Sequence, residues 1–114
     1  MWFGFRVPRE RIEVVDGDSI RVVGDATDYS DAVLYRLIGY DAPETHRPKT
    51  EHEAGWGAFA TGKMKEAIAN ATRIRLRPKV FGQRWHRNSR LAWLYLDGVD
   101  VAEIAIKEGW GQPF

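Results

Sequence analysis

The sequence predicts an α+β domain, mainly β: a five-stranded barrel like the oligonucleotide/oligosaccharide-binding (OB) fold, with an inserted helix and a short C-terminal helix. Three observations predict this fold. Five short segments have the apolar patterns of strands, one long segment between the third and the fourth has helical periodicity, and the length of 114 residues fits one domain, residues 1–114. A closed barrel also removes the exposed edges that short strands would otherwise present.

The first three strands are expected at residues 11–15, 19–23 and 32–38. In the first of them, Ile12 and Val14 alternate with polar neighbours. Asp16-Gly17-Asp18 predicts a tight turn, because glycine tolerates positive φ and aspartate side chains accept hydrogen bonds from nearby backbone N–H groups. The third segment is almost wholly apolar, which indicates burial on both faces.

A long amphipathic helix is expected after a loop at residues 39–49. Thr50 and Glu53 match a capping box, which marks its start. Apolar side chains recur on one side of the helical wheel, and this side is expected to face the core: Phe59, Ala60, Met64, Ala67, Ile68 and Ala71.

The last two strands are expected at residues 72–77 and 90–96, and a short helix follows them. Pro78 is expected to end the first of these strands or to mark a sheet edge, because proline cannot donate to a ladder. Asp97-Gly98 predicts the turn after the second strand. Asp100 is a suitable N-cap for the final helix, and Gly109 is expected just past its end.

The composition excludes some classes of protein. The formal net charge is +1, so a nucleic-acid partner would need local positive patches. Cysteine is absent, which removes disulfides and thiolate metal sites. We expect no membrane span and no signal peptide, since no apolar run approaches about 20 residues and the N-terminus lacks a cleavage motif. The compartment stays unknown, and we expect a monomer without an obligate protein partner.

Two segments carry residues suited to chemistry. One is the Asp16–Ser19 turn, which taken alone usually indicates only a hairpin. The other places Arg36 on an apolar strand and then Asp41, Pro43 and Glu44 in a loop. A charged side chain on a mostly apolar strand is costly unless it is paired or used, so this second segment points to a function.

Together these segments resemble the staphylococcal nuclease (thermonuclease) family. The family has an Asp-Gly-Asp-Thr turn, followed by an Arg-Leu-x-x-x-Asp-x-Pro-Glu stretch. The first motif is matched with serine for threonine, and the second is matched with its spacing unchanged from Arg36 to Glu44. The resemblance continues through Gly82-Gln83-Arg84, Leu91-Ala92-Trp93 and Glu108-Gly109-Trp110, and it covers about nine-tenths of the chain.

The resemblance implies a single divalent cation, typically Ca²⁺, held by the carboxylates of Asp18 and Asp41 and by the backbone carbonyl of Ala42. These are hard oxygen ligands, which suit calcium or magnesium rather than zinc or copper. The resemblance also implies that Glu44 activates or orients the attacking water and that Arg36 binds the phosphate and stabilises its transition state. The alternative for Arg36 is a purely structural pairing with Asp41 or Glu44.

The second catalytic arginine of the family falls where this sequence departs from the family pattern. The family has Asp-x-Tyr-Gly-Arg-x-Leu-Ala before the fifth strand, and the stretch from His86 to Ala92 is one residue short. Aligned from Gly82, the arginine falls on Arg90; aligned from Leu91-Ala92, it falls on Ser89, with Arg87 nearest. We favour Arg90 over Arg87.

Substrate contacts are expected in the loop before the fifth strand, where Arg84, Trp85 and Arg87 interleave charge with an aromatic ring. Such a loop suits single-stranded nucleic acid, whose bases can stack on exposed rings. The stripe of Arg73, Arg75 and Arg77 is interpreted as a solvated outer face, and the alternative is a track for the phosphate backbone. Trp110 could stack on a base or close the barrel, and the sequence does not separate these.

The sequence thus predicts a metal-dependent endonuclease that hydrolyses DNA or RNA phosphodiesters with little sequence preference. By the family resemblance, the products would carry 3′-phosphates. The alternative is a non-catalytic OB-fold module, derived from a nuclease, that binds nucleic acid or protein.

Overall fold

The computed structural model describes residues 4–24, 32–43, 51–80 and 89–113. The elements follow one another in the order β1 (Phe5–Arg6), the 3-10 turn η1 (Arg9–Arg11), β2 (Ile12–Asp16), β3 (Ser19–Val22), β4 (Val33–Leu37), β5 (Tyr40–Asp41), α1 (Glu51–Asn70), β6 (Ile74–Pro78), β7 (Arg90–Leu96), β8 (Val99–Asp100), α2 (Val101–Lys107) and β9 (Gln112–Pro113).

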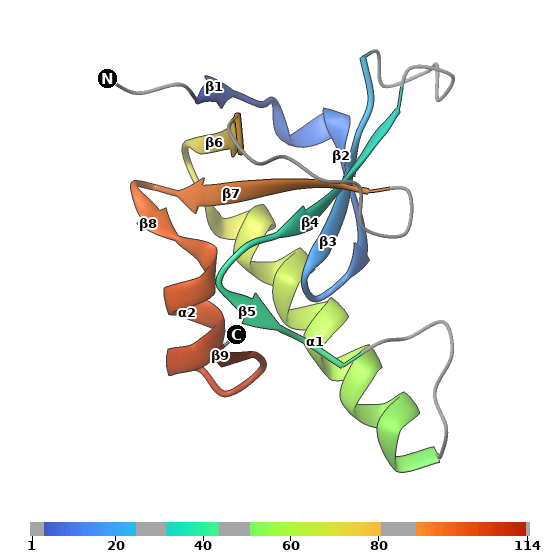
Figure 1. Ribbon diagram of the computed structural model, residues 1–114. Coiled ribbons are helices and arrows are strands. Elements are labelled where there is room, and N and C mark those ends of the chain that lie inside the picture. The colour runs from blue at the N-terminus through green and yellow to red at the C-terminus, as the bar shows by residue number, and fades with distance from the viewer. Residues whose placement is uncertain (1–3, 25–31, 44–50, 81–88, 114) are drawn as a thin grey trace.

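Most of these strands form one curled sheet in the order β1-β6-β7-β4-β3-β2, with β8 also paired to β7 (Figure 1). The pairing of β4 with β7 is parallel, and it joins the hairpin half of the sheet to the half that follows α1. The predicted α+β, mainly β, OB-like class is therefore confirmed. The two-residue strands β1, β5, β8 and β9 were not expected, because so short a run has no periodicity to detect.

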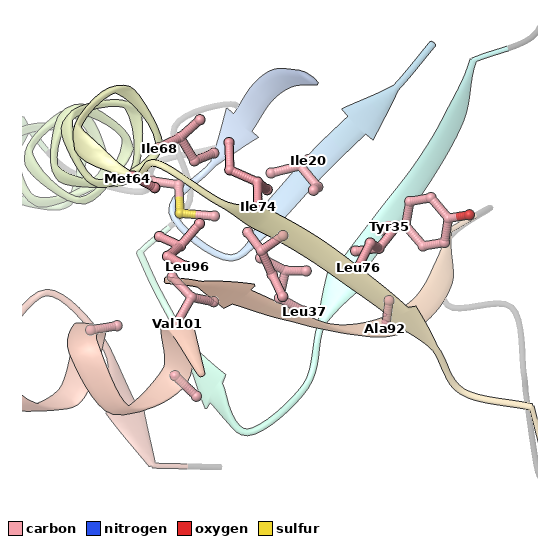
Figure 2. Close-up of a cluster of buried hydrophobic side chains, with 14 of the residues drawn as sticks. Ile20, Tyr35, Leu37, Met64, Ile68, Ile74, Leu76, Ala92, Leu96 and Val101 are labelled. Atoms are coloured by element: carbon pink, nitrogen blue, oxygen red, sulfur yellow. The ribbon is translucent and has the colours of Figure 1, made fainter. Parts of the chain in front are cut away.

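The apolar side chains of the sheet and of α1 meet in a single core (Figure 2). Ile20, Leu37 and Leu76 point inward from three strands and are at most 1% exposed. Met64 and Ile68 cover them from α1, as the helical periodicity predicted. Strand β4 is buried on its inner side, at Tyr35 and Leu37, whereas Arg36 on its outer side is only half-buried. The expected burial of this strand on both faces is therefore incomplete.

One residue of the predicted core-facing stripe of α1 was placed wrongly. Phe59 is 45% exposed, whereas Ala60 next to it is fully buried. The ring of Phe59 packs edge-on against Trp56 instead, with the ring centroids 5.9 Å apart. A helical wheel gives the direction of each side chain around the helix axis, but not how much of the helix the rest of the chain covers. Here the core packed against α1 does not extend as far as Phe59. Thr50 lies outside the described residues.

The caps of α2 were predicted correctly and direct the chain toward β5. Asp100 accepts a hydrogen bond from the Ala102 N–H at 2.9 Å. Gly109 has φ +80°, and the Trp110 N–H bonds to the Ala105 carbonyl at 3.0 Å, which completes a Schellman motif. This turn buries Trp110 and brings β9 beside β5 (Figure 1). Neither helix described here combines the length and apolar character that a membrane crossing requires.

Asp97, in the turn after β7, supplies a pH-dependent contribution to stability. Its carboxylate accepts the Arg73 N–H at 2.7 Å and the Thr72 N–H at 3.0 Å, and these two bonds lower the pKa of Asp97. A carboxyl whose pKa is lower in the folded state stabilises the fold above its unfolded pKa, and the contribution disappears as the pH falls through the folded pKa.

We therefore expect Asp97→Asn to be less stable than the native chain at pH 7. The change keeps a residue that tolerates the φ of +52° at this position. The difference should shrink as the pH falls below roughly 4, the ordinary aspartate value, since both side chains are then uncharged. Urea unfolding at pH 7 and pH 3 measures it, and an equal difference at both pH values would contradict the assignment.

Candidate active site

The turn between β2 and β3 is buried, although two of its residues are acidic. Asp18 is 3% exposed and Asp16 is 9% exposed. A side chain at Gly17 would place its Cβ 2.8 Å from the Cβ of Ala42 and 2.9 Å from the Cβ of Ala60. Glycine is thus required here by the close approach of the β5 segment and of α1, rather than by an unusual φ.

The segment that carries Asp41 is fastened to this turn by hydrogen bonds. The Leu37 N–H donates to the Asp18 carbonyl at 2.8 Å, and the Tyr40 hydroxyl donates to the Gly17 carbonyl at 2.6 Å. The chain reverses between β4 and β5 at Gly39, whose φ is +103°. These contacts bring the two acidic motifs of the sequence, which are more than twenty residues apart, to one place.

Asp18, Arg36 and Asp41 meet at this place. Register explains how: Ser19 of β3 lies opposite Arg36 of β4, so the Arg36 side chain starts beside Asp18. The Arg36 Nη2 lies 3.1 Å from the Asp18 Oδ2 and is also in contact with the Asp41 Oδ1. The side chains of Asp18, Arg36 and Asp41 are 4%, 22% and 46% exposed, so the cluster runs from the interior to the surface.

The electrostatics of the cluster are set by burial and by neighbouring charges of both signs. Burial raises the pKa of Asp18, and the neighbouring carboxylates of Asp41 and Asp16 add to the rise. Two contacts oppose it: the Ala42 N–H donates to the Asp18 Oδ2 at 3.1 Å, and the Arg36 guanidinium lies beside the same oxygen. Such an arrangement favours the arrival of a further positive charge.

The oxygen atoms at this place fit a hard cation. Asp18 and Asp41 supply carboxylates, and Ala42 supplies a backbone carbonyl in the same segment. Within the part of the chain that the structure describes, no group of three or more His, Cys, Asp or Glu side chains is placed to hold a metal by itself. A cation here would complete its coordination with water or substrate oxygens. Glu44 lies outside the described residues.

Arg90 lies on a different face of the sheet from Arg36. In the parallel pairing of β4 with β7, Arg90 is opposite Tyr35, and Leu91 is opposite Arg36. Because successive side chains of a strand point to opposite faces, Arg90 shares the face of the buried Tyr35. Burial raises the pKa of the Tyr35 hydroxyl, and Arg90 partly offsets the rise.

Ser89 lies two residues before Leu91, so it shares the face of the sheet on which Leu91 and Arg36 lie, and it is 5% exposed. The alignment anchored at Leu91-Ala92 therefore agrees with the face on which Arg36 lies. Arg87 falls outside the described residues, as do Arg84 and Trp85. The choice between Arg87 and Arg90 stays a prediction.

Two aromatic residues that hold the site together were missed or left open by sequence reasoning. Tyr40 is 1% exposed, and its hydroxyl bridges the two turns. Trp110 is 2% exposed and meets Tyr40 edge-on, with the ring centroids 6.0 Å apart. Trp110 is therefore a core residue that packs against Tyr40. The position of Tyr40 directly before Asp41 was the only sequence signal of its role.

This chain is similar to two bacterial endonucleases. It is 33% identical over 95 residues to Endonuclease YncB of Bacillus subtilis and 35% identical over 95 residues to the SPbeta prophage-derived endonuclease YokF of the same organism. Each match covers 83% of this chain, but it spans only 42% of the first relative and 30% of the second. No family model matches the chain.

Proposed function

We propose that this domain hydrolyses phosphodiester bonds in DNA or RNA, with calcium as its metal ion, and leaves 3′-phosphate ends. The observation that carries the proposal is the contact of Asp18 and Asp41 with one guanidinium nitrogen of Arg36. Carboxylates are suited to binding a hard cation and a guanidinium is suited to binding phosphate, so their contact supports the proposal. The similarity to two proteins named endonuclease, and the motifs shared with the staphylococcal nuclease family, support the same activity.

Asp18, Asp41 and the Ala42 carbonyl would hold the calcium ion. When bound, the ion would neutralise part of the phosphate charge and lower the pKa of the attacking water. The rise that Asp41 and Asp16 cause in the pKa of Asp18 supports this assignment, because a divalent cation relieves repulsion between neighbouring carboxylates. With so few protein ligands, positions are left for water and for a phosphate oxygen.

Arg36 and Glu44 would bind the phosphate and move the proton in the proposed reaction. Arg36 would bind a phosphate oxygen in place of one of its present carboxylate partners and stabilise the charge that grows on it. Glu44 would accept a proton as the oxygen of water attacks phosphorus. The bond from phosphorus to the 5′-oxygen then breaks, and this oxygen takes a proton from solvent water as it leaves, while the proton on Glu44 returns to solvent. Because the contacts are to phosphate, we expect slight sequence preference and easier access to single strands.

The proposal is tested by incubating the chain with end-labelled single-stranded DNA and RNA, with millimolar calcium or with excess chelator. We expect cleavage only with calcium, 3′-phosphate products, and a large loss of turnover in Glu44→Gln with unchanged folding. In the same assay, Arg87→Ala and Arg90→Ala compared side by side identify the second arginine by the larger loss.

Other results would assign other functions. Salt-sensitive binding of the strand without any cleavage would replace the enzyme with a non-catalytic binding module. Calcium should also raise the melting temperature, by the equivalent of about 2.7 kcal/mol at one hundred times its dissociation constant. Absence of this shift would remove the metal assignment independently of activity.

A further inference from the structure

A pocket of about 500 Å³ adjoins the candidate active site on the side of α1 and β9. Asp41, Ala42 and Pro43 form the wall that it shares with the site. Its other walls come from α1 and from the segment after α2: Trp56, Phe59, Ala60, Gly109, Trp110, Gly111 and Gln112. The volume lies in the range of about 300–1,000 Å³ in which small-molecule groups bind.

Two exposed aromatic rings form a corner of this pocket. Trp56 is 47% exposed and Phe59 is 45% exposed, and their rings lie at 83° with centroids 5.9 Å apart. They are three residues apart on α1, so they share one side of the helix. Neither ring belongs to the buried core, which α1 joins through Ala60, Met64 and Ile68. Two large rings held together at the surface beside a pocket indicate a contact surface.

The chemistry of the walls selects a flat, uncharged group. No lysine, arginine or histidine is among the described residues that line the pocket, and Asp41 is among them, so these described walls offer a phosphate no cationic partner. Aromatic faces favour a planar ring, and the exposed Gln112 side chain can donate and accept hydrogen bonds at the edge of such a ring. A nucleobase has these properties.

Asp41 belongs both to the pocket and to the candidate active site, so the base in the pocket would be one close to the phosphate that is cut. Gln112 of β9 lies opposite Asp41 of β5, and Asp41 contacts the Arg36 Nη2. Since Asp41 also lines the pocket, a strand whose phosphate is bound at Arg36 has the pocket beside it.

We propose that the pocket binds a base of the substrate strand next to the phosphate that is cut, with Trp56 and Phe59 as its stacking surface. This inference rests on the proposed function, because nucleic acid must be the substrate for a base to reach the pocket.

Binding can be tested without cleavage. The affinity of a fluorescently labelled single-stranded oligonucleotide is measured with excess chelator for the native chain, Trp56→Ala and Phe59→Ala. We expect each change to weaken binding about 5- to 150-fold, the range found when one stacked base loses its ring. Phe5→Ala is the matched control, because Phe5 is 44% exposed on β1 and does not line the pocket. It should leave the affinity unchanged.

An abasic oligonucleotide of the same length separates base stacking from other contacts. With this probe, Trp56→Ala and the native chain should bind equally. If Trp56→Ala loses the same affinity for both probes, the base assignment is overturned. It is also overturned if Trp56→Ala, Phe59→Ala and Phe5→Ala bind the normal strand with equal affinity. Melting temperatures of all variants show whether the changed chains are folded, and a drop confined to the pocket variants with unchanged binding would make the rings structural.

The outcome is distinguishable from failure of the nuclease proposal. If the native chain binds the strand and Trp56→Ala weakens that binding, but no calcium-dependent cleavage occurs, the enzyme proposal fails and the base pocket stands. If cleavage occurs and the pocket variants cut with unchanged KM, the enzyme proposal stands and the base pocket fails.

Discussion

Replacing Arg36 with methionine is expected to lower the turnover of the proposed nuclease by about 10³- to 10⁵-fold, the loss found when a phosphoryl-transfer site is deprived of an arginine. The reason is geometric: the guanidinium is held at the point where Asp18 and Asp41 converge, which is where the phosphate is proposed to bind. Arg36→Lys should recover only part of the loss, because an ammonium group lacks the planar fork that binds two oxygens at once.

The same change should also lower stability in the absence of metal. Asp18 is 3% exposed, and Arg36→Met would remove its ion-pair partner and leave it the Ala42 N–H. The cost should be at least roughly 1–3 kcal/mol, the penalty when a buried polar group loses a partner. Calcium should restore much of this loss, because it would neutralise the same carboxylates. Denaturant unfolding with and without calcium measures both effects, separately from single-turnover cleavage.

Arg21→Met is the matched control. Arg21 lies on the neighbouring strand β3 and pairs with Glu13 at 2.9 Å, where both side chains are at least one-third exposed. An exposed pair of this kind contributes about 0–1 kcal/mol, so both turnover and stability should stay close to the native values. Cleavage by Arg36→Met within tenfold of the native rate would remove Arg36 from the mechanism.

Gly17→Ala is expected to destabilise the chain by about 1–3 kcal/mol, the usual cost of adding a methyl group to a packed interior. The new Cβ would meet Ala42 and Ala60 at 2.8 and 2.9 Å, and the backbone of Ala60 at 3.3 Å. The strain would have to be relieved by moving the β2–β3 turn away from β5 and α1. Such a movement would also separate Asp18 from the Ala42 N–H, so metal binding should weaken as well.

Gly62→Ala is the same substitution at a position with open space around it, and it should raise the stability of the chain rather than lower it. A Cβ at Gly62 meets nothing within 4 Å, and the position lies inside α1. Alanine there should stabilise the helix by about 0.5–1 kcal/mol. Thermal unfolding of the two variants in parallel measures the contrast, and a Gly17→Ala chain as stable as Gly62→Ala would refute the close packing of the turn.

Much of the fold could be predicted because its signals are local. Asp97-Gly98 forms the expected turn with φ values of +52° and +84°, and Asp100 caps α2 as predicted. Strand β7 has the predicted bounds, Arg90–Leu96. In each case the information lies in a few consecutive residues, whose dihedral preferences and hydrogen-bonding groups act within one turn of chain.

The candidate site was less predictable, because a motif shows which residues are present but not which residues of other strands lie next to them in the fold. The convergence of Asp18, Arg36 and Asp41 was inferred from a family resemblance. Its physical basis in this chain is the register of β3 against β4 together with the hydrogen bonds that fasten the Asp41 segment to the β2–β3 turn. The parallel register of β4 against β7 places Arg90 beside Tyr35, which no local pattern encodes.

The sequence by itself determined the tight turn at Gly17, the apolar side of α1 around Met64, and the acidic residues available for a cation. Only the tertiary structure decided that Tyr40 bridges the two turns and that Trp110 is buried, while Phe59, predicted for the core, stands exposed beside Trp56. The reason is physical. Periodicity gives the direction of a side chain relative to its own backbone, whereas burial depends on surfaces brought together from distant parts of the chain.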